Sequence, residues 1–406
     1  MLLQIAWKNI WRNKVRSIVI LTAIAIGIFA GMFIMAFYYG MVDQRIETAI
    51  KSEASHIQIH EKGYMADPEV KKYMANGNQI MDWVKSQSGV QHVSGRVIVN
   101  AMIASAETGS GVRILGINPD DEKEVTDIHS RLIDGEYLEG IKRNPVLIGQ
   151  KLAQKLNVDV RKKLVLTMQD VNGEIVYASF RVAGIYKTSN TMYDESTVFV
   201  RQSDLSKLLG LKSGQVQEIA ILLNNNEILP QVKSDIEQKY PDRDVKDWSE
   251  LMPEVSLVED SMNISMYIIM GIILLALLFS IINTMLMAVL ERRKELGMLM
   301  AVGMNRPRVF SMIMFETIML SLVGTGAGIF IGYLFTFIFS YVGIDLSKWA
   351  IAYESMGFDT IVYPILKTSM TVRVVIMVFV TGFIACLLPA YKALKLNPAE
   401  AIRIDI

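Results

Sequence analysis

The stretch ERRKELGMLMAVGMNRPR, at Glu291–Arg308, interrupts an otherwise apolar C-terminal half. Long apolar runs flank it on both sides, so we expect a short loop between two membrane-spanning helices. Five basic and two acidic residues predict that the loop is cytoplasmic. Its apolar middle, Leu296–Met304, allows two interpretations. It forms a helix that fills a groove on a cytoplasmic partner, or a helix that lies flat on lipid headgroups.

The composition points to a membrane protein with a large polar segment. The chain has 406 residues, 51% of them hydrophobic, and its apolar residues concentrate in four blocks of spanning length, about 20 residues each. Residues 43–260 hold 26 Lys and Arg against 33 Asp and Glu, and the remainder holds 15 against 8. An acidic polar segment beside basic membrane flanks does not suggest nucleic-acid binding. The single Cys386 lies in the last block, so neither a disulfide framework nor a Cys-based metal site is expected.

The basic segments fix the expected topology. An amphipathic N-terminal segment rich in Lys and Arg predicts a cytoplasmic helix. A signal peptide is the alternative interpretation. The apolar run that follows favours the first, because it is long enough to span a membrane and longer than the apolar core of a usual signal peptide. Alternation then places the acidic segment outside and the C-terminal tail inside. The expected order is a cytoplasmic helix 1–16, first span 17–42, outer domain 43–260, stalk and second span 261–290, cytoplasmic coupling segment 291–309, third span 310–342, outer loop 343–371, fourth span 372–390 and tail 391–406.

The outer segment carries its own strand and helix signals. HIQIH alternates like a strand, DVNG at 170–173 is a hairpin signal, and Leu147–Leu156 is expected to be helical. The mixed pattern predicts an α+β domain with room for two lobes, one inserted into the other. His56 and His60 share a strand face, which we expect to be solvated, because two histidines alone do not make a zinc site. Neither a phosphate-binding loop nor a nucleophile elbow occurs, so we expect no catalytic residue and no cofactor in this chain.

Side chains in and beside the spans suggest a substrate path. Phenylalanines recur four apart on one face of the first span, and methionines extend the apolar character of the second span outward. Aromatic and Met side chains adapt to lipid-like substrates, although ordinary helix packing uses the same residues. The candidate path residues are Phe29, Phe33, Phe37, Met262 and Met266.

The third span carries two further features. Glu316 lies near its start, where a carboxylate faces protein or water, or snorkels to the interface. Gly324, Gly328 and Gly332 form two overlapping G-x-x-x-G units. These predict close helix packing, within one bundle or between subunits.

Four segments resemble the permease subunits of the MacB-like (type VII) ABC transporters, which include the FtsX-like permeases. These segments are AWKNIWRNKVRS (6–17), VLIGQKLAQKLNV with GEIVYASFRVAGIY (within 146–186), ERRKELGMLMAVGMNRPRVFSMIMFE (291–316) and LLPAYKALKLNPAEAIR (387–403). The resemblance implies a four-helix membrane protein with a porter-like α+β lobe and an inserted second lobe, in the inner membrane. It also implies that the coupling segment docks on a separate ATPase, through Glu295, Leu296, Gly297, Met300, Ala301, Gly303, Met304 and Arg308.

A fifth segment, GINPDDEKEVTDIHSRLIDGEYL (116–138), resembles the lipoprotein-releasing LolC/LolE branch. It implies mechanical release of lipoproteins from the outer leaflet, with ATP and Mg²⁺ on a LolD-like ATPase, a second permease protomer, surrounding membrane lipids and a periplasmic carrier as partners. LolC-like subunits grip that carrier with an extended hook; the matching hairpin here is only DVNG, which fits a LolE-like role or release without such a carrier. The alternatives are export of small amphiphiles or peptides, as in MacB-like exporters, and FtsX-like signalling to a cell-wall hydrolase.

Overall fold

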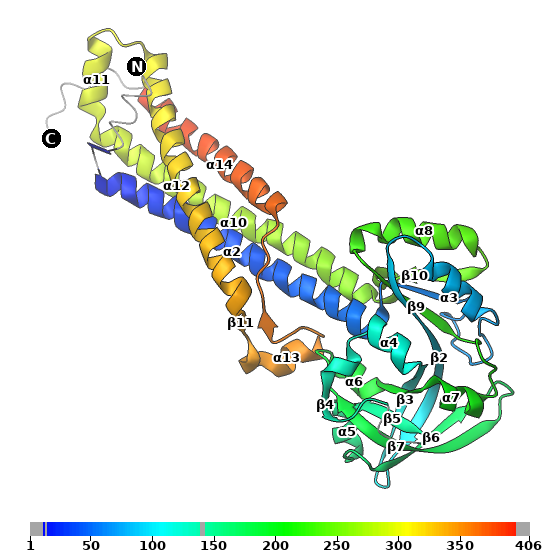
Figure 1. Cartoon of the computed structure of the whole chain (residues 1–406). Helices are drawn as coiled ribbons and strands as arrows, with labels where there is room; N and C mark the ends of the chain where they lie inside the picture. The colour runs from blue at the N-terminus through cyan, green and yellow to red at the C-terminus, as the bar shows by residue number, and fades with distance from the viewer. Residues whose placement is uncertain (1–10, 13, 139–142, 395–406) are drawn as a thin grey trace. The chain divides into compact units, whose positions relative to one another are not determined.

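The computed structural model describes residues 11, 12, 14–138 and 143–394 (Figure 1). Most of the predicted cytoplasmic helix at 1–16 and most of the tail at 391–406 therefore lie outside the described residues. The chain forms two compact units. The helical unit contains residues up to Val42, Glu259–Asp345 and the chain from Ile361 onward, and the α+β unit contains Asp43–Val258 and Leu346–Thr360.

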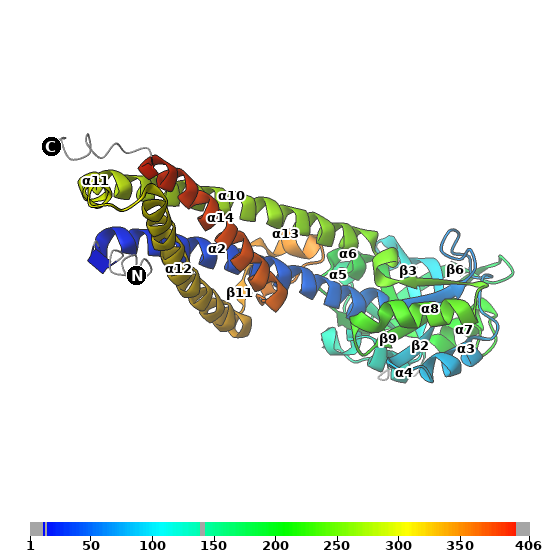
Figure 2. The same cartoon turned by 90° about the horizontal axis from the view of Figure 1, so that it is seen from above.

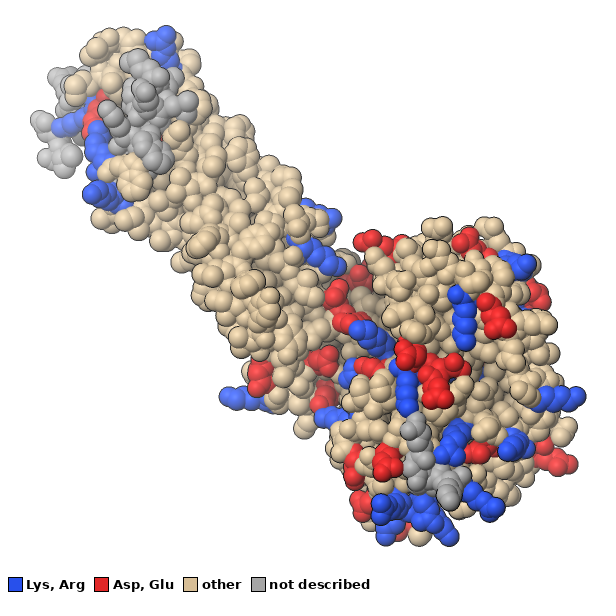
Figure 3. Space-filling view, viewed as in Figure 1, with Lys and Arg blue, Asp and Glu red and all other residues tan. Residues whose placement is uncertain are grey.

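In the described part of the chain, the helical unit is built from four long helices and one short one. Its helices are α2 (Lys14–Thr48), α10 (Pro253–Glu291), α11 (Arg293–Ala301), α12 (Arg306–Val342) and α14 (Thr368–Leu394). Among the described residues, four helices are long and apolar enough to cross a membrane: Ser17–Ala54, Pro253–Glu291, Arg306–Val342 and Thr368–Leu394. The helices lie side by side in both views (Figures 1 and 2). The visible face of this unit is largely uncharged between its ends (Figure 3), as a lipid-facing surface requires.

The glycines of α12 allow it to approach α2 closely. A Cβ at Gly324 would lie 2.9 Å from the Ile24 Cβ, and one at Gly328 would lie 2.8 Å from the Ala25 carbonyl oxygen. A Cβ at Gly332 would lie 3.3 Å from Met32 side-chain atoms. The structure thus places the predicted packing residues against α2 of the same chain, where only a hydrogen atom fits.

Replacing Gly328 with Leu should therefore separate α12 from α2. The new side chain has no space, so we expect a loss of about 1–3 kcal/mol or more of stability and a lower yield of inserted protein. The matched control is Gly326→Leu on the same helix, because no described atom lies within 4 Å of the position its Cβ would take. Thermal unfolding of both purified variants checks this, and equal melting temperatures would contradict it.

The α+β unit contains a mixed sheet in the order β10-β1-β9-β2-β3-β8-β5-β7-β4, with β6 paired to β2 and β7. Its strands are β1 (Ile57–Glu61), β2 (Val90–Ala104), β3 (Gly109–Ile117), β4 (Leu132–Gly135), β5 (Pro145–Gly149), β6 (Lys163–Gln169), β7 (Ile175–Tyr186), β8 (Thr197–Arg201), β9 (Glu218–Leu223) and β10 (Arg243–Asp247). Its main helices are α3 (Gly77–Lys85), α4 (Pro119–Val125), α5 (Gln150–Leu156), α6 (Thr191–Ser196), α7 (Gln202–Leu209) and α8 (Leu229–Lys239).

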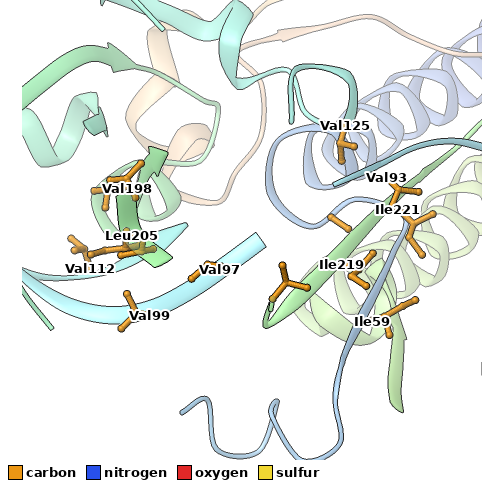
Figure 4. Packing of buried hydrophobic residues seen from close by; sticks show 14 of the residues in the cluster. Ile59, Val93, Val97, Val99, Val112, Val125, Val198, Leu205, Ile219 and Ile221 are labelled. Carbon is orange, nitrogen blue, oxygen red and sulfur yellow. The ribbon is translucent and has the colours of Figure 1, made fainter. Parts of the chain in front are cut away.

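Strand β2 joins two lobes. Its residues 90–96 pair with β9, and its residues 97–104 pair with β3. The segments from β3 to β8 form the second lobe. In the sequence they lie between β1 and β9, which belong to the first lobe. The second lobe is therefore inserted into the first, as predicted. Buried side chains of both lobes flank the strand, with Val99, Val112 and Val198 towards one end and Val93 and Ile221 towards the other (Figure 4).

Two details of the sequence interpretation are wrong. Leu147 lies in strand β5, between parallel β7 and antiparallel β8, and the helix begins only at Gln150. His60 is fully buried, and His56 nearly so, because other parts of the α+β unit cover both faces of β1. The His60 ring stacks on Tyr64 and contacts the Gln217 carbonyl oxygen at 3.1 Å. Burial lowers the pKa of both histidines, that of His56 to about 4, so they are neutral structural residues.

Candidate coupling site

The coupling segment folds into α11, a nine-residue helix set between α10 and α12. Arg292 leaves the helical conformation and separates α10 from α11. Gly303 ends the segment with φ +107°, a left-handed conformation that favours glycine. Asn305 then caps α12 by accepting a hydrogen bond from the Arg308 backbone N–H, with Pro307 in the first turn.

One face of α11 packs onto the helical unit. Leu296 is only 2% exposed and belongs to its core, together with Met285, Val289 and Met312. Gly297 is also buried, and Met300 and Met304 are partly buried against the same core. Leu296 therefore holds α11 in place, and motion of α11 must move the ends of α10 and α12.

A series of ion pairs also attaches the start of α11 to the helical unit. The Arg292 guanidinium donates to the Glu295 carboxylate at 3.1 Å and to the Glu316 carboxylate at 3.3 Å, and Arg12 pairs with Glu295. Burial acts to raise the pKa of the Glu295 carboxyl, but hydrogen bonds from Arg12 and Arg292 outweigh it and leave that pKa below its usual range. Glu316 is buried. The sequence allows a Glu316 carboxylate that faces protein or one that snorkels to the membrane interface. The structure favours the first, because the ion pair with Arg292 connects α12 to the start of α11.

The opposite face of α11 is apolar and exposed, with no described residue packed over it. Val302 is 84% exposed and Met298 is 57% exposed, with Leu299 beside them. Apolar side chains presented this way on a helix suit a groove on another protein. Of the residues predicted for coupling, Ala301, Gly303 and Arg308 are exposed, whereas Leu296 and Gly297 point inward. Met298 and Val302 were missed; helical spacing groups them on the face opposite Leu296 and Met300.

The structure divides the candidate substrate-path residues into two groups. Phe29 and Phe33 face α12, with ring centroids 5.1 Å from Phe335 and 5.6 Å from Phe339 respectively. This arrangement favours helix packing over a path for these two residues. Phe37 is partly buried and contacts Tyr38.

The methionines of the stalk lie elsewhere. Met266 lines a small cavity between α2, α10 and α14, and Met262 is partly buried on the same helix. Four other methionines share the cavity, and the Tyr39 hydroxyl donates to Asn263 at its edge at 3.1 Å. Met266 therefore borders a mainly apolar cavity that is separate from the phenylalanine face, and Met262 is not among the residues that line it. Nowhere among the described residues do three or more His, Cys, Asp or Glu side chains gather as metal ligands.

Comparison with protein families assigns both halves of the chain. Residues 17–239 match the MacB-like periplasmic core domain, and residues 267–398 match the FtsX-like permease C-terminal domain. An uncharacterized ABC transporter permease, MJ1507 of Methanocaldococcus jannaschii, is 25% identical over 98% of this chain and 96% of its own. The lipoprotein-releasing system transmembrane protein LolC of Neisseria meningitidis is 22% identical over 96% of this chain and 94% of its own.

Other relatives and solved structures are more distant or partial. The pyoverdine export ATP-binding/permease protein PvdT of Pseudomonas fluorescens is 23% identical over 98% of this chain, which spans 58% of that protein. The periplasmic region of MacB from Actinobacillus actinomycetemcomitans is 12% identical, with a TM-score of 0.35 over 49% of this chain and 92% of its own. The extracellular domain of YknZ is 14% identical, with a TM-score of 0.33 over 47% of this chain and 99% of its own.

Proposed function

This chain belongs to the ABC transporter permeases that join a MacB-like periplasmic core domain to an FtsX-like C-terminal domain, and we propose that it drives release of lipoproteins from the outer leaflet of the inner membrane. The likeness to LolC along nearly the whole chain carries the choice of substrate. In this proposal a separate ATPase binds ATP and Mg²⁺, two permease protomers pair, and the chain needs no cofactor of its own.

The helix lengths support a mechanical coupling. Helix α10 has 39 residues, which corresponds to about 58 Å, against a hydrocarbon core of about 30 Å. It ends at Glu291, next to α11, and begins at Pro253 in the α+β unit. Because an uninterrupted helix is stiff, movement of the Glu291 end of α10, which α11 displaces on the ATPase, passes along α10 to its first turns in the α+β domain.

The energetics explain why release needs ATP. Each CH₂ of a buried acyl chain contributes about 0.8 kcal/mol, so a chain of sixteen carbons contributes roughly 12 kcal/mol to membrane retention. A triacylated protein is therefore not extracted by thermal motion at a useful rate. Squeezing the α+β domains together during an ATP cycle is a way to supply that work.

Photocrosslinking tests the substrate directly. With a photoreactive residue at Phe37 or Met262, we expect ATP-sensitive crosslinks to palmitate-labelled lipoproteins in membranes that contain the ATPase. The matched control is Ile272 on α10, which is well exposed and should label phospholipid whether or not ATP is present. The readout is the labelled lipoprotein band with and without ATP.

Absence of lipoprotein crosslinks at Phe37 and Met262, with the ATPase still bound, would show that lipoprotein release is wrong. Capture of a small amphiphile instead would support export, which the likeness to PvdT favours as a second candidate function.

The β6–β7 hairpin fits export as well. Its turn closes within Asp170–Gly173, where Asp170 accepts the Asn172 and Glu174 backbone N–H groups, and it leaves no extended hook to grip a carrier.

A further inference from the structure

The connection between α12 and α14 contributes to the α+β unit. Leu346–Thr360 belongs to that unit, although the helices on both sides of it belong to the helical unit. It contains the turn η4 (Ser347–Trp349) and helix α13 (Ala350–Ser355). The short strands β11 (Ile344–Asp345) and β12 (Ile361–Val362) pair antiparallel and close the connection where it begins and ends.

Three polar contacts hold this connection to the segment between β7 and α6. The Lys187 ammonium pairs with the Glu354 carboxylate at 2.9 Å. The Thr191 hydroxyl donates to the Glu354 carbonyl oxygen at 3.1 Å, and the Ser189 hydroxyl donates to the Asp359 carboxylate. We call these five residues the clasp. Three of them, Lys187, Ser189 and Thr191, alternate along 187–191, so every second side chain of this short segment contacts the connection.

A second layer joins the clasp to the end of α2. Gly357, at φ +79°, lies so close to Arg45 that a Cβ there would be 2.7 Å from the Arg45 Nε. Arg45 pairs with Glu53 at 3.0 Å, and both side chains are buried. The Asn190 amide donates to both Glu53 carboxylate oxygens at 3.2 Å, and Asn190 lies inside the 187–191 segment. The connection is therefore held by the clasp contacts on one side and packs closely against the buried Arg45–Glu53–Asn190 group on the other.

Helices α2 and α10 each run from the helical unit into the α+β unit and can transmit force between them. We infer that the clasp provides a third connection, which transmits motion of α11 through α12 into the α+β domain. Helix α12 follows α11 after four residues, so it moves when α11 moves. A loose loop after α12 would absorb that motion, whereas paired β11 and β12 and a clasped α13 pass it on. Lys187 and Glu354 are positioning residues in this route. The inference rests on the proposed mechanical function, without depending on which substrate is released.

Charge reversal tests the clasp without any substrate. The full permease–ATPase complex carries spin labels at Ile175→Cys in both protomers, in a Cys386→Ala background, and the distance between labels is measured with and without ATP. Ile175 is well exposed on β7. We expect Lys187→Glu and Glu354→Lys each to reduce the ATP-dependent distance change at least twofold, with ATP hydrolysis within twofold of the parent. The double reversal should restore the change.

The matched control is the exposed pair Lys155–Glu195 on the same unit. Reversing either of its charges should leave the distance change intact. Full movement in the single clasp variants, or failure of the double reversal to restore it, would overturn the clasp. A parent complex without ATP-dependent movement would overturn both the clasp and the mechanical function. Movement that depends on the clasp, with no lipoprotein crosslinks, would refute the substrate alone.

Discussion

Val302→Asp is expected to abolish ATP-driven transport while the permease remains inserted and folded. Val302 is 84% exposed, so the folded chain loses almost no internal packing. A carboxylate forced into an apolar groove of the ATPase without a partner costs several kcal/mol. Since about 1.4 kcal/mol is a tenfold change, we expect affinity for the ATPase to fall by about 100-fold or more. Co-purification of the ATPase from membranes measures this directly.

Two further variants separate docking from folding. Val302→Thr keeps the shape without a charge and should retain most of the bound ATPase. Leu296→Asp places a carboxylate in the core of the helical unit, so this variant should fail to accumulate. Unchanged ATPase binding by Val302→Asp would show that the outward face of α11 is not the docking surface, and would favour the flat interfacial helix.

The position of the short helix α11 could be predicted from sequence, but which of its faces is buried could not. Apolar blocks and basic flanks indicate where the chain turns on the cytoplasmic side. Both faces of the short helix are apolar, with Leu296 and Met300 on one and Met298 and Val302 on the other. Periodicity separates the two faces without indicating which is buried, because only the positions of α10 and α12 decide that. A Met300→Asp variant would consequently disturb folding and docking together.

The errors in the α+β domain have a related cause. Alternation predicts one solvated face for a strand, but both faces of β1 are covered, so His60 is buried. The short apolar run at Leu147 satisfies helix and strand patterns equally well, and its pairing with β7 and β8 selects the strand. The Lys187–Glu354 pair joins residues 167 apart, which no local pattern reveals.

Arg96→Met is expected to give the largest loss of stability among the charge variants of the α+β domain. Arg96 is 1% exposed and lies where β2 passes from one lobe to the other. It donates to Glu122 of α4 at 2.6 Å and to Glu218 of β9 at 2.7 Å, and both carboxylates are buried. Removing one partner of a buried ionic cluster costs about 3–5 kcal/mol, because the remaining charges cannot return to water.

The surrounding residues provide the controls for this prediction. Arg113 also contacts Glu218, at 3.2 Å, but is 46% exposed, so Arg113→Met should cost at most about 1 kcal/mol. Burial acts to raise the pKa of Glu218, yet Arg96 and Arg113 outweigh it and keep that pKa below its usual range. Without Arg96 the carboxylate loses its main counter-charge, and adding Glu122→Gln and Glu218→Gln to Arg96→Met should recover much of the loss. Thermal unfolding of the purified full chain ranks the variants. Equal losses for the two arginines would show that the buried ionic cluster stabilises the domain no more than the exposed Arg113 does.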